Sequence, residues 1–166
     1  MNHFLIQALR YSSWATQTLI ARCRDLTSEQ LTQPARGYGS ILATLDHLVT
    51  SDAHYVTTLS GTPPEGGAKI PPAETLEEIA ARVEETLERW EQFLAEPFDT
   101  ERLLTLDQGA YECHASVVAV QALHHGSAHR EQVRAALKEL GVEPPDLQPW
   151  EGALELGRAR WTKDRS

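Results

Sequence analysis

The chain contains little cysteine, fewer cations than anions, and no long apolar run. Its two cysteines, Cys23 and Cys113, are too few for a disulfide framework, so we expect both to be reduced and buried. Lysine and arginine number 15 against 24 acidic residues, and the net charge of −9 disfavours nucleic-acid binding because an acidic surface repels phosphates. No apolar stretch approaches the ~20 residues that span a bilayer. The N-terminus lacks the features of a signal peptide. We therefore expect a cytoplasmic protein that binds neither nucleic acid nor membrane.

Apolar side chains are present in the amount that one buried core requires. They make up 41% of the 166 residues, and a chain of this length fits a single domain covering residues 1–166.

Four segments place apolar residues at the three- and four-residue spacing of a helix face. They predict helices at about 3–24, 41–60, 76–95 and 117–140. Residues 102–115 alternate loosely around a glycine, which is typical of two short strands or an extended excursion. The sequence therefore predicts an all-α fold, an antiparallel four-helix bundle with a short extended excursion before the last long helix.

Polar residues at the helix starts predict where three of these helices begin. Ser40, Thr75 and Ser116 each precede an apolar pattern and are good N-caps, and Thr27 with Gln30 predicts a capping box for a short turn of helix. The apolar stripe of the first helix is predicted at Phe4, Ala8, Tyr11, Ala15 and Leu19. The tail that follows the last helix is expected to pack against the bundle.

Histidines are concentrated in the stretch ALHHGSAHREQV, residues 122–133. His125 and His129 are four apart, so a helix places both on one face, close enough for two imidazoles to reach one metal ion. His124 lies about 100° away around the helix and cannot join them. Small apolar neighbours indicate that the face of His125 and His129 turns inward. The pair is either a metal site or two core histidines with satisfied ring nitrogens.

A third ligand would have to come from another helix. His3, His47 and His54 lie in predicted helical segments, and the last two share one face. The residues alone leave the choice between His47 and His54 open.

Several segments together resemble the DinB-like (YfiT-like) family of metalloenzymes. The first helix carries YSSWATQTL, the second carries Leu45-Asp46-His47-Leu48 within SILATLDHLVTSDAHYVTTLSG, and the last carries an H-x-x-x-H-R-x-Q motif. That motif is matched by His125, His129, Arg130 and Gln132. The likeness runs from about residue 4 to residue 155, which would be the core of the domain.

The resemblance implies a homodimeric four-helix bundle in which His47, His125 and His129 hold one divalent metal ion, zinc or nickel. Related proteins include metal-dependent thiol transferases and a maleylpyruvate isomerase. The resemblance therefore implies an enzyme that activates a thiol or water, with a small-molecule partner such as a low-molecular-weight thiol. The alternatives are a metal-dependent hydrolase and a non-catalytic, stress-related metal-binding module. No catalytic side chain can be named.

Other polar residues have open roles near this predicted site. Asp52 and Gln132 could hydrogen-bond an imidazole or metal-bound water, although Asp52 could equally be solvated. Arg130 should point away from the metal, toward an acidic residue on another helix. Tyr111 and His114 could line the mouth of the site.

Tyr11 and Trp14 are expected to serve packing rather than a substrate pocket. Cys113 is too weakly placed to be a nucleophile.

Overall fold

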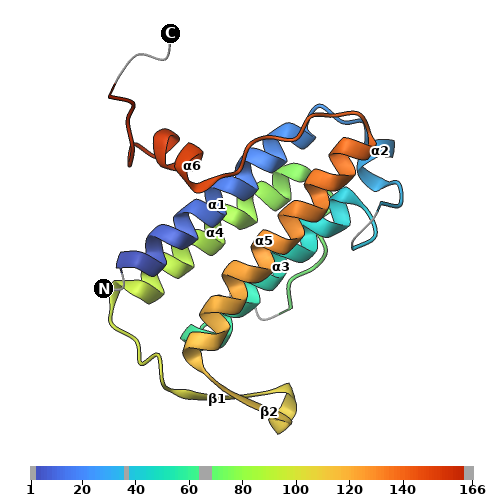
Figure 1. The fold of residues 1–166 in the computed structure, drawn as a ribbon. Helices are drawn as coiled ribbons and strands as arrows, with labels where there is room; N and C mark the ends of the chain where they lie inside the picture. Colours follow the sequence, from blue (N-terminus) through green and yellow to red (C-terminus); the bar gives the residue numbers. More distant parts are fainter. Residues whose placement is uncertain (1–2, 36–37, 64–68, 163–166) are drawn as a thin grey trace.

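The fold is an all-α bundle of four long helices, as the sequence predicts (Figure 1). The computed structural model describes residues 3–35, 38–63 and 69–162. The long helices are α1 (His3–Cys23), α3 (Ile41–Ser60), α4 (Leu76–Ala95) and α5 (Ala115–Glu139). None of the helices in the described part of the chain is long and apolar enough to cross a membrane.

The shorter elements lie at the ends and on the outside of this bundle. They are α2 (Ser28–Thr32), α6 (Pro149–Glu155), the strands β1 (Leu103–Leu106) and β2 (Tyr111–His114), and the 3-10 turn η1 (Asp107–Gly109). The two strands pair antiparallel, with Leu103 opposite His114 and Leu106 opposite Tyr111. The excursion predicted before the last helix is therefore a β-hairpin, and it lies beyond one end of the bundle (Figure 1).

Neighbouring helices differ in relative direction. Helix α3 runs antiparallel to α5, and α1 runs antiparallel to α4 (Figure 1). Helices α3 and α4 run in the same direction. Two contacts show this: Asp46 pairs with Arg82 near the starts of the helices, and Thr57 pairs with Arg89 farther along both. Helix α4 therefore begins at the end of the bundle where α3 begins.

Apolar stripes meet in the middle of the bundle. Most of the apolar residues of α3 and α4 are buried there, and Trp90 on α4 is the largest fully buried side chain of the described residues. The stripe predicted for α1 is wrong at its start, because Phe4 is 83% exposed. Ser12 and Thr16 lie on the buried face instead. Their hydroxyl groups are satisfied there by Arg130, so burying them costs little.

The helix starts follow the predicted caps with one exception. Ser40 and Thr75 cap α3 and α4, and Thr27 forms the capping box of α2. Ser116 does not cap α5, which begins one residue earlier at Ala115. The backbone N–H groups of Ala115 and Ser116 donate to carbonyl groups of the segment before β1, at 2.9 and 3.0 Å. Because these donors are already paired, the helix needs no side-chain cap.

The tail packs along α1, as expected. The Tyr11 hydroxyl donates to the Leu147 carbonyl at 2.6 Å, and the Trp14 indole N–H donates to Glu155 at 2.7 Å. Tyr11 and Trp14 therefore serve packing. Trp150 and Trp161, the tryptophans of the tail itself, are both exposed.

Candidate metal centre

Three histidines from α3 and α5 converge on one group, and the face that was expected to turn inward is only partly buried. One ring nitrogen from each of His47, His125 and His129 lies within 4.8 Å of the other two, and all three residues are partly buried. A search of the described residues for clustered histidine, cysteine or acidic side chains that could hold a metal ion finds this one group. His47 comes from α3 and the other two from α5. These residues meet because the two helices lie side by side and run antiparallel.

The nitrogen positions suit a small divalent ion. Nε2 of His47 and Nε2 of His125 are 3.1 Å apart. Ligand nitrogens about 2.0–2.1 Å from a tetrahedral ion would lie about 3.3 Å from each other. Nδ1 of His129 is 2.8 Å from the side-chain oxygen of Gln132, which can only accept a hydrogen bond. That bond places the proton of His129 on Nδ1 and leaves the Nε2 lone pair for a metal, so Gln132 orients this ring.

Two tyrosines surround the three rings. The ring of Tyr38 stacks on His47, with centroids 3.8 Å apart and planes at 14°, and meets the edge of His129 at 6.1 Å. Tyr55 packs edge-on against His125 at 5.6 Å. The candidate centre is therefore bounded by aromatic side chains.

Burial keeps two of the imidazoles neutral. Removal from water, followed by the influence of neighbouring histidines, lowers the pKa of His125 to about 4. The pKa of His47 is also lowered, mainly by burial and then by His129, although Asp46 opposes the change. Neutral imidazole is the form that coordinates a metal, so both rings are ready to bind at neutral pH.

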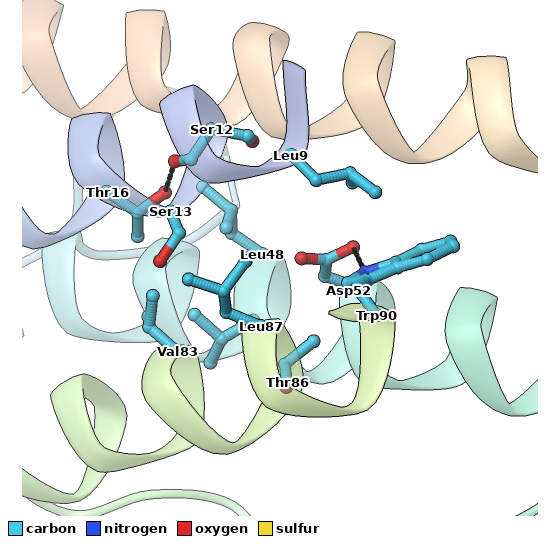
Figure 2. A pocket seen from close by; sticks show the side chains of 11 residues that line it. Leu9, Ser12, Ser13, Thr16, Leu48, Asp52, Val83, Thr86, Leu87 and Trp90 are labelled. Carbon is cyan, nitrogen blue, oxygen red and sulfur yellow. Dashed lines mark hydrogen bonds between the residues drawn. The ribbon is translucent and has the colours of Figure 1, made fainter. Parts of the chain in front are cut away.

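Asp52 lies away from this centre, inside the bundle. Its carboxylate accepts a hydrogen bond from the Trp90 indole at 3.1 Å (Figure 2). Burial raises the pKa of this carboxyl to about 6, although the Trp90 bond and the charges of Arg130 and Arg89 oppose the rise. The same carboxylate lines an internal cavity of about 10 Å³ together with the side chains of Ser12, Ser13, Thr16 and Thr86. The structure therefore excludes Asp52 from direct contact with the histidines.

Arg130 also points into the interior, away from the three rings, as predicted. It is only 3% exposed and donates to the Ser12 hydroxyl at 3.0 Å and to the Thr16 hydroxyl at 3.2 Å. The arginine of the motif therefore joins α5 to α1 behind the candidate centre. The hydrogen bonds of Arg130 go to Ser12 and Thr16 rather than to the acidic residue that was expected on another helix. Burial lowers the pKa of Arg130, and the charge of Asp52 on α3 is among the effects that oppose this change.

The remaining candidates lie elsewhere. His3, His54 and His124 are exposed and outside the cluster. Tyr111 and His114 belong to β2, and His125 lies ten residues beyond Ala115, about 15 Å along α5. They do not line the mouth of the centre.

Sequence reasoning missed the role of the two tyrosines. Tyr55 stands eight residues after His47, a spacing that leaves it about 80° away around the helix, so the spacing alone did not place it beside the cluster. Tyr38 lies in a loop, where spacing carries no such information.

The fold and the histidines together define a class of protein, an all-α bundle with three imidazoles that could hold a metal ion. Comparison with known families matches residues 1–156 to the DinB family, and the chain belongs to that family. A search of curated proteins finds no match.

Proposed function

We propose that His47, His125 and His129 bind one divalent ion, zinc or nickel, and that the bound ion activates a thiol or a water molecule for reaction with a small-molecule substrate. The observation that carries this proposal is the convergence of three ring nitrogens within 4.8 Å. The Gln132 bond supports it, because a partner on the second ring nitrogen is typical of metal-binding histidines.

Three protein ligands leave coordination positions for water or substrate, whereas structural zinc sites have four protein ligands. A bound zinc ion supplies Lewis acidity and can lower the pKa of its water to about 7. The protein supplies neutral nitrogen donors held by α3 and α5, so the charge of the centre remains available to a thiolate or hydroxide. The family resemblance supports a low-molecular-weight thiol as the partner, and a homodimer as the assembly.

One observation favours a second candidate, a non-catalytic metal-binding module. Asp52, Tyr111 and His114 were the polar groups expected near the centre, and all three lie away from the histidines. If the protein is an enzyme, none of these three groups assists the reaction at the ion. If it is a binding module, the same centre needs no further group.

Cobalt loading of histidine variants tests the proposal. Wild-type protein should bind one Co²⁺ per chain, and His47→Ala, His125→Ala and His129→Ala should each weaken binding by at least tenfold because a ligand is lost. His124→Ala is the matched control, since this exposed histidine lies next to a ligand in sequence. Equal metal content in all five proteins, measured by elemental analysis, would refute the ligand assignment.

The same cobalt protein tests the chemistry. Glutathione and cysteine serve as thiol probes, and a thiolate that enters an open position should produce a new sulfur-to-cobalt absorption band. The band should be absent from the His125→Ala protein. If wild-type protein binds the metal but shows no change with either thiol, the thiol class is wrong and the non-catalytic module is favoured.

A further inference from the structure

The three imidazoles are oriented in different ways. A ligating histidine is usually fixed by a hydrogen bond from its second ring nitrogen, and Gln132 provides this bond for His129. Within the described part of the chain, Nδ1 of His47 has no such partner. Rotation of the His47 ring would move its Nε2 away from the other two nitrogens, so another contact must restrain it.

Tyr38 makes that contact. Its ring lies almost parallel to the His47 ring at a centroid distance of 3.8 Å, which is full face-to-face contact. A rotation of either ring about its side-chain bond would separate the two faces. The His129 ring lies nearly perpendicular to the Tyr38 ring, with centroids 6.1 Å apart, so the tyrosine is close to imidazoles from both helices.

The backbone around Tyr38 is tied to the start of α3. The Ala35 N–H donates to the Gly39 carbonyl at 2.6 Å, and Gly39 adopts a φ of +100°, which favours glycine. Ser40 follows at once and caps α3, the helix that carries His47. Tyr38 therefore lies two residues before the N-cap of the helix that carries His47, which ties its backbone to the start of that helix.

We propose that Tyr38 is a positioning residue of the metal centre, which holds the His47 imidazole toward the other ligands and covers that side of the triad. This inference rests on the proposed function. Tyr38 is 53% exposed, so its ring stands between solvent and the partly buried His47. Removal of the ring should therefore loosen the ligand and open a path for a competing chelator.

Three variants separate the stacking contact from other effects. Tyr38→Ala removes the ring, and Tyr38→Phe retains it without the hydroxyl. Tyr111→Ala removes a tyrosine of nearly equal exposure, 51%, from the hairpin. Each protein is loaded with Co²⁺, and its dissociation constant, its visible absorption spectrum and its rate of metal loss to a chelator are measured.

Tyr38→Ala should bind Co²⁺ roughly two- to tenfold more weakly, the scale of one aromatic pair, with a changed spectrum and faster metal loss. Tyr38→Phe and Tyr111→Ala should match wild type. Because Tyr38 is half exposed, the fold should persist, which circular dichroism checks.

A Tyr38→Ala protein that matches wild type in all three measurements overturns the role of Tyr38. A Tyr38→Phe protein that behaves like Tyr38→Ala overturns the stacking argument, because the hydroxyl would then be the active feature. In both cases wild type still binds the metal. Failure of wild type itself to bind would instead overturn the proposed function.

Discussion

At the scale of single residues, folding changes the ionisation of Asp52 in a way that can be tested. Burial raises the pKa of its carboxyl from 3.8 to about 6, so the folded protein holds this proton more tightly than the unfolded chain does. Linkage then requires that Asp52 lower the free energy of unfolding as pH rises from about 4 to about 6, with no further change above that range. Below about pH 4 the carboxyl is protonated in both states.

The Asp52→Asn variant should remove this dependence, because the amide does not titrate and its oxygen can still accept the Trp90 bond. The measurement is urea unfolding of metal-free protein between pH 4 and pH 8. Wild type should lose stability relative to Asp52→Asn as pH rises to about 6, by up to about 3 kcal/mol at 1.36 kcal/mol per pKa unit.

Ser13→Ala is the control, because it alters the same cavity without a titrating group. Its stability difference from wild type should not vary with pH. The other ionisable groups are the same in every variant, so their contributions cancel in the comparison. A difference between wild type and Asp52→Asn that is constant over pH 4–8 would show that burial does not shift this carboxyl.

At the scale of elements, the docking of α6 on α1 depends on a glycine. A Cβ atom at Gly152 would lie 2.6 Å from Cε3 of Trp14, and the indole is also held by Glu155. Gly152→Ala should therefore displace α6, at a cost typical of overpacking, about 1–3 kcal/mol. Hydrogen exchange should show lost protection in residues 149–156 while α3 and α5 remain protected.

A double-mutant cycle identifies the cause of that displacement. If the clash with Trp14 is responsible, Gly152→Ala should cost less in a Trp14→Ala background than in wild type. Additive costs would point to the backbone of Gly152 rather than to the indole.

The elements also show which features of this fold and candidate site the sequence pattern predicts. Periodicity located the long helices, and the spacing of His125 and His129 placed two candidate ligands on one face. It could not choose His47 over His54, because that choice depends on how α3 is rotated against α5, and the family resemblance supplied it. Periodicity failed for the start of α1, since the buried face carries Ser12 and Thr16. Polar residues reach the core only with a partner, and the partner, Arg130, lies on another helix.

At the scale of the whole molecule, the candidate metal centre connects parts of the chain that are far apart in sequence. His47 and His125 are 78 residues apart, and their ring nitrogens meet only when α3 and α5 are packed. The unfolded chain cannot present the three ligands together, so an ion that binds the folded state must stabilise it.

Thermal unfolding should therefore shift upward with metal concentration. At a free Zn²⁺ or Ni²⁺ concentration of 100 times Kd, the gain is about 2.7 kcal/mol, which raises Tm by roughly 5–10 °C for a chain of this size. The shift should continue logarithmically with concentration, and a chelator should reverse it. His124→Ala should show the full shift and His125→Ala none. A similar rise in the His125→Ala protein would mean that the stabilising ion binds elsewhere, because that variant lacks one ligand from the only helix that contributes two.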